Sequence, residues 1–94
     1  MSATLTNMCE FIEAAQLRVP REVHPMSRCF IHEDISEIRE HFEDTRYVMR
    51  LLTKVHHRIA RDLRWAADDA ATVRHFKEAY RLRRRASKFE AAYG

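Results

Sequence analysis

A scarcity of turn-forming residues limits what this chain can fold into. Its 94 residues include one glycine and two prolines, whereas β-sandwiches and barrels need many turns built from Gly, Pro and Asn. The glycine-rich loops of P-loop and dinucleotide-binding proteins are excluded for the same reason. Hydrophobic residues make up 46% of the chain, so a disordered polymer is not expected either. The sequence therefore predicts one small all-α domain over residues 1–94.

Neither a membrane segment nor a secretion signal is visible. No apolar run approaches the roughly 20 residues that cross a bilayer, and the N-terminal segment MSATLTNMCEF has no basic stretch of the kind that opens a signal peptide. We therefore expect a cytoplasmic protein. Cys9 and Cys29 are too few for a disulfide scaffold, and we interpret both as small apolar side chains.

The spacing of apolar residues predicts where the first helices lie. Leu5, Met8 and Ile12 recur at helical intervals, which predicts a short helix over about residues 4–18 that ends before Pro20. Residues 19–33 hold both prolines and are predicted to form a packed linker. A second helix over about residues 34–66 is predicted from an Asp-x-x-Glu capping pattern. An apolar row at intervals of three and four residues then continues along it.

The segment after residue 66 leaves two alternatives, because it contains neither Gly nor Pro. One is a single uninterrupted helix. The other is a turn at Asp68–Asp69, which we favour because adjacent Asp residues prefer helix caps to helix interiors. A third helix over about residues 69–92 then completes a long antiparallel helical hairpin. The segment ADDAATVRHFKEAYRL resembles the hairpin junction of one tetratricopeptide half-repeat, and the matching positions are Ala67, Asp68, Phe76, Ala79 and Leu82. This resemblance implies a hairpin.

The charge distribution suggests a binding surface. Residues 1–45 contain four basic and nine acidic residues, whereas residues 46–94 contain thirteen basic and five acidic ones. Arg58 is predicted to lie level with Lys77, and Lys54 with Arg81 or Leu82, so that the cations of two helices merge into one surface. Such a surface would bind an acidic protein or nucleic-acid phosphates, with Tyr47, Tyr80 and Trp65 available for base stacking. The predicted partner-binding residues are Arg46, Arg50, Lys54, Arg58, Arg74, Lys77, Arg81, Arg84, Arg85 and Lys88.

A hairpin with one short helix buries little core, so the remaining apolar surface predicts self-association. We expect a homo-oligomer, in the first instance a helical-bundle dimer. His56 lies within the apolar row, where a polar residue can set the register of an interface or make assembly depend on pH. The predicted interface residues are Val48, Leu51, Val55, His56, Phe89 and Tyr93.

Metal binding and catalysis receive little support. Cys29 and His32 have the spacing of zinc ligands and His24 is near them, but a structural zinc site needs four ligands. Glu37 and His41 are four residues apart, whereas di-iron bundles use a Glu-x-x-His motif on two helices. Nucleophilic catalysis by Cys29 would need a base held in place beside it and a pocket that excludes water. We therefore expect no metal, no cofactor and no enzymatic activity.

These observations favour a non-enzymatic protein-binding regulator, that is, an adaptor, antagonist or inhibitor of a larger macromolecular partner. In style, small Arg-rich helical chains of this kind resemble accessory proteins of phages and mobile elements. The alternative is a helical module that binds nucleic acid through the same cations, and a third option is a purely structural oligomer. Salt distinguishes the first two, because affinity for phosphates falls log-linearly with salt concentration.

Overall fold

The computed structural model describes residues 19–93. This region consists of three helices without a strand: α2 (Pro25–Glu40), α3 (Thr45–Thr72) and α4 (Phe76–Tyr93). The prediction of an all-α fold is thereby confirmed for the described residues. The helix predicted over about residues 4–18, together with Cys9, lies outside them. None of the three helices combines the length and apolarity needed to cross a membrane.

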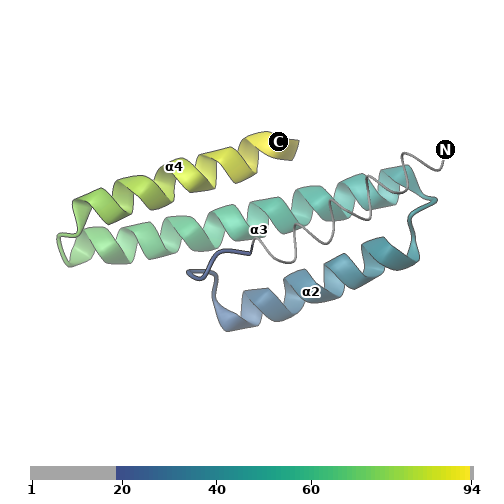
Figure 1. The fold of residues 1–94 in the computed structure, drawn as a ribbon, viewed down its shortest axis with the longest axis horizontal. Helices are drawn as coiled ribbons and strands as arrows, with labels where there is room; N and C mark the ends of the chain where they lie inside the picture. Colours follow the sequence, from purple (N-terminus) through teal and green to yellow (C-terminus); the bar gives the residue numbers. More distant parts are fainter. Residues whose placement is uncertain (1–18, 94) are drawn as a thin grey trace.

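The long helix α3 lies in the middle of the molecule and packs against both other helices (Figure 1). Helix α2 runs antiparallel along the N-terminal half of α3, and α4 runs antiparallel along the C-terminal half. An ion pair between Asp34 and Lys54 marks the first pairing, and one between Arg64 and Glu90 marks the second. Because the two shorter helices cover different halves of α3, the molecule is elongated, measuring 49 × 22 × 20 Å.

Helix α2 corrects the predicted linker, because residues 25–33 are helical. Pro25 occupies the first turn of the helix, where the missing amide proton costs nothing and the fixed φ is already helical. The preceding residue caps the helix, since His24 Nδ1 accepts a hydrogen bond from the Met26 backbone amide at 3.1 Å. The proline that suggested a linker is therefore part of a helix start.

A break at residues 41–44 corrects the second prediction, which was one continuous helix over about residues 34–66. Helix α2 ends at Glu40, and Asp44 caps α3 by accepting the Tyr47 amide at 3.1 Å. A straight helix would leave its apolar row without a partner, whereas folding back buries Ile31, Ile35 and Ile38 at 0–1% exposure. Hydrophobic burial therefore favours a turn here, although the segment contains neither glycine nor proline.

The hairpin turn between α3 and α4 also lies later than predicted. Asp68 and Asp69 are inside α3, and the chain turns at residues 73–75. Arg74 adopts a left-handed φ of 64°, while the amides of Arg74 and His75 donate to Ala71 and Ala70 at 3.0 and 2.7 Å. This is the Schellman arrangement that usually has glycine at the left-handed position. The hairpin is present, but its turn is not at Asp68–Asp69.

The core of the chain itself contains most of the predicted dimer interface. Val48, Leu51, Val55 and His56 are 0–8% exposed in the single chain, so they are not available for contacts between copies. Phe89 is half-buried against the same core, and the side chain of Tyr93 lies outside the described residues. The excess apolar surface that motivated a dimer is thus absent at these four positions. The dimer stays a prediction.

Candidate functional site

The register of the hairpin separates the two predicted lines of cations. Arg64 of α3 lies beside Glu90, and Asp68 lies beside Arg83, so the prediction that Arg58 is level with Lys77 is wrong. Lys54 instead pairs with Asp34 of α2 at 3.7 Å, and the Arg58 guanidinium lies 4.9 Å from the ring centroid of Phe30, also in α2. These two cations of α3 therefore border α2 rather than α4.

Ion pairs join α4 to α3. Arg64 binds the Glu90 carboxylate through two nitrogens at 2.9 Å each, and Arg83 reaches Asp68 at 3.2 Å. Hydrogen bonding to Arg64 lowers the pKa of Glu90. These cations are neutralised within the molecule, because each is committed to a carboxylate on the neighbouring helix.

Arg81 is neutralised in a similar way. Its guanidinium contacts Glu78 at 2.5 Å and Glu22, in the segment before α2, at 3.2 Å. The hydrogen bond from Arg81 lowers the pKa of Glu78. Arg85 is half-buried nearby, and it lines an open groove of about 840 Å³ with Arg21, Glu22 and Arg81. Arg81 is thus engaged with the N-terminal part of the described chain, and Arg85 lines the groove beside it.

The remaining cations of α4 form an outward surface that we call the α4 strip, made of Phe76, Lys77, Tyr80, Arg84 and Lys88. All five side chains are exposed, and Phe76 and Tyr80 are 65% and 63% exposed. No ion pair among the described residues involves its three cations. Arg84 lies 5.8 Å from the ring centroid of Tyr80. The strip therefore presents uncompensated positive charge with aromatic surface between the cations.

On α3, the structure adds two arginine–aromatic pairs. Arg58 lies over Phe30, and Arg61 lies over Trp65, each with the guanidinium carbon 4.9 Å from the ring centroid. Sequence reasoning missed Arg61 and Phe30 as site residues. The four-residue interval between Arg61 and Trp65 is a sequence signal for the first pair, whereas Phe30 meets Arg58 only because α2 folds back. Arg46 and Arg50 are exposed on the same helix, and Arg74 is exposed in the hairpin turn.

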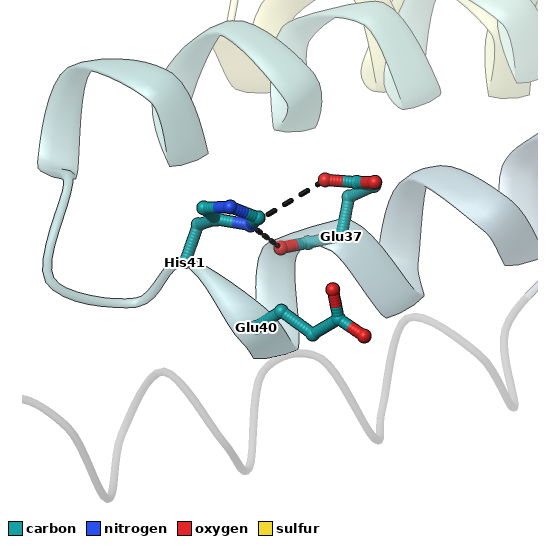
Figure 2. A group of neighbouring side chains, drawn as sticks. All are labelled: Glu37, Glu40 and His41. Atoms are coloured by element: carbon teal, nitrogen blue, oxygen red, sulfur yellow. Dashed lines mark hydrogen bonds and ion pairs between the residues drawn. The ribbon is translucent and has the colours of Figure 1, made fainter.

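A group of polar side chains lies at the C-terminal end of α2, where the α2–α3 turn begins (Figure 2). Ligand-type atoms of Glu37, Glu40 and His41 all lie within 4.8 Å of one another. The His41 ring faces Glu37, with Nδ1 at 3.0 Å from its carbonyl oxygen and 3.4 Å from its carboxylate. Tyr47 donates to the same carboxylate at 3.2 Å and stacks on His41 at 5.1 Å. The carboxylate of Glu37 therefore already has protein partners that join α2 to α3.

The metal ligands considered from the sequence do not converge. Among residues 19–93, the only group of three or more candidate ligands is Glu37, Glu40 and His41, so His24, Cys29 and His32 do not form one. All three are exposed.

No protein-family model, curated protein or solved structure matches the chain.

Proposed function

We propose that the protein is a non-enzymatic protein-binding regulator that docks an acidic surface of a larger partner on the α4 strip. The observation that carries this proposal is the contrast in charge compensation along α4. Arg81 and Arg83 are paired with carboxylates of the same chain, whereas Lys77, Arg84 and Lys88 are not. Carboxylates on a partner would complete the missing pairs.

The aromatic side chains of the strip favour a protein as the occupant. Tyr and Arg are enriched among the residues that contribute most to protein–protein affinity, and here Tyr80 and Arg84 lie against each other. Phe76 adds apolar area at the start of the helix, where it is 65% exposed. Because the strip lies on a helix that is packed on α3, little ordering is needed on binding, which reduces the entropic cost.

A pull-down with matched charge reversals tests the proposal. The wild-type protein, an Arg84→Glu/Lys88→Glu variant and an Arg46→Glu/Arg50→Glu control are each used as bait in lysate of the source cells, and one half of the lysate is treated with nuclease beforehand. Both variants change the net charge equally, and all four side chains are exposed. We expect a protein partner at constant stoichiometry with wild type and control, and its loss with the α4 variant.

Two outcomes would contradict the proposal. A partner that still binds the α4 variant would mean that the strip is not the contact surface. Recovery of nucleic acid alone, lost after nuclease treatment, would move the function to the nucleic-acid-binding alternative.

A further inference from the structure

A second surface, outside the α4 strip, combines cations with aromatic rings on α3 and α2; Phe30, Arg61 and Trp65 are exposed there and Arg58 is half-buried. We call it the aromatic–arginine face and define it by Phe30, Arg58, Arg61 and Trp65. Trp65 is 58% exposed and Phe30 is 46% exposed, although large aromatic side chains are usually well buried. The two arginines are three residues apart on α3, so they are neighbours on one side of the helix. The two arginine–aromatic pairs are therefore adjacent.

The cations of α3 extend this face along the helix. Arg46, Arg50, Lys54, Arg58 and Arg61 follow one another at intervals of three or four residues, which places them on one side of a helix. From Arg46 to Trp65 the helix rises by about 28 Å. We call this row of five cations the basic track; its C-terminal end lies beside the aromatic rings of Phe30 and Trp65.

Acidic side chains compensate this track only in part. Lys54 contacts Asp34 at 3.7 Å, and Arg61 contacts Asp62 at 3.5 Å. Asp62 is only 3% exposed, and its other carboxylate oxygen accepts the His24 amide at 3.1 Å, so it presents little negative charge to solvent. Among the described ion pairs, none involves Arg46, Arg50 or Arg58.

From this arrangement we infer that the aromatic–arginine face binds single-stranded nucleic acid. Bases stack on exposed aromatic rings regardless of sequence, while cations beside them follow the phosphates. Guanidinium groups stack on rings and also contact phosphate with two nitrogens. Paired bases in a duplex are not free to stack on Phe30 and Trp65, so the face prefers a single strand. This activity is independent of the α4 strip and would make the protein an adaptor between a nucleic acid and a protein.

The fluorescence of Trp65 tests the inference directly, because the chain contains one tryptophan. A thymidine oligonucleotide of about 15 nucleotides, within the site sizes known for single-strand binders, is titrated into the full-length protein at low salt. We expect saturable quenching of the tryptophan emission. The logarithm of the binding constant should fall linearly with that of salt concentration, with a slope of about −0.7 per phosphate contacted.

Variants assign the binding to this face. The variants are compared at about 0.15 M salt, where exposed charges more than about 8 Å apart are largely screened. Arg58→Glu/Arg61→Glu keeps the tryptophan and should weaken binding at least tenfold, whereas Arg84→Glu/Lys88→Glu makes the same charge change on the α4 strip and should weaken it much less. Trp65→Ala, followed by anisotropy of a labelled oligonucleotide, should weaken binding about tenfold. Circular dichroism verifies that each variant is folded.

Three results would overturn the inference. The first is absence of quenching by the oligonucleotide. The second is an equal loss of affinity in both charge-reversed variants, which would show non-specific attraction. The third is equal binding of a duplex or of poly-glutamate of similar charge, which would assign the face to a polyanion or an acidic protein instead. None of these results bears on the α4 strip, so failure here leaves the proposed function standing.

Discussion

Asp62 shows how one buried carboxylate positions a whole helix. It lies on α3 at 3% exposure, and its Oδ2 accepts the backbone amide of His24, which caps α2. The hydrogen bond therefore ties the start of α2 to the middle of α3. A carboxylate near a helix N-terminus is also favoured by the helix dipole. The sequence around Asp62 does not predict this hydrogen bond, because its partner His24 lies 38 residues away in the chain.

Replacing Asp62 by Ala should lower the free energy of unfolding by about 1–3 kcal/mol, because the His24 amide loses its acceptor at a partly buried position. Asp69→Ala provides the matched control, since Asp69 is exposed on the same helix and its loss should cost less than about 0.5 kcal/mol. Urea denaturation of both variants measures the difference. Equal effects would show that the tie between α2 and α3 does not contribute to stability.

His56 should make stability depend on pH. Burial lowers its pKa below the ordinary value of 6.5, and the ring contacts the Leu52 carbonyl through Nδ1 at 2.7 Å. The unfolded chain therefore takes up the proton at a higher pH than the folded chain. The free energy of unfolding consequently falls as the pH drops below about 6.5, and it stops falling once the folded form is also protonated.

Thermal unfolding followed from about pH 7.5 to about pH 5.5, the range in which histidine titrates, measures this effect. The decline in melting temperature should be clearly smaller in His56→Leu than in wild type. His32→Leu, which changes an exposed histidine of α2, should retain the wild-type decline. If both variants keep the full decline, another group is responsible.

At the scale of elements, the positions of the two turns determine which parts of α3 pack against α2 and which pack against α4. The turn at residues 41–44 depends on Asp44, whose side chain accepts the backbone amide of Tyr47 in the first turn of α3. The turn at residues 73–75 depends on Arg74 in a left-handed conformation. Neither turn has the glycine or proline that ordinarily signals one, so sequence reasoning joined α2 to α3 and placed the hairpin turn too early.

Loss of the α3 cap should be measurable. Asp44→Ala should lower the free energy of unfolding by about 1 kcal/mol, because the Tyr47 amide loses its acceptor. Asp44→Ser retains a capping oxygen and should stay close to wild type. Chemical denaturation compares the three proteins, and an equally destabilised Ser variant would argue against a capping role.

The hairpin turn should gain stability from glycine. Arg74→Gly should raise the free energy of unfolding by about 0.5–1 kcal/mol, because a side chain at positive φ is strained and glycine is not. Arg50→Gly, in the interior of α3, should instead lower it by about 1 kcal/mol. A destabilised Arg74→Gly protein would indicate that the arginine side chain supports the turn.

At the scale of the whole molecule, one helix serves two interfaces. Helix α2 contributes Ile31, Ile35 and Ile38 to the core, α4 contributes Ala79, Leu82 and Ala86, and α3 packs against both. The small side chains of α4 allow close approach to α3. Because both interfaces share α3, we expect the described part to unfold as one cooperative unit.

Core truncations on opposite sides of α3 test this cooperativity. Ile35→Ala and Leu82→Ala should each lower the free energy of unfolding by about 2–5 kcal/mol, since both residues are at most 2% exposed. Each variant should show one transition by circular dichroism and by tryptophan fluorescence. Two separate transitions in Leu82→Ala, with α2 and α3 unfolding later, would contradict a single cooperative unit.

The sequence by itself determined that the described chain is helical, that a hairpin forms near its C-terminal end, and that cations line its helices. These features follow from local quantities, namely the scarcity of glycine and proline, apolar spacing and charge. Tertiary structure decided where the helices end and which cations meet carboxylates. Burial of Ile31, Ile35 and Ile38 outweighs the local preference for one long helix, and a shifted hairpin register pairs Arg83 with Asp68. Such choices depend on contacts between distant residues, which no local pattern specifies.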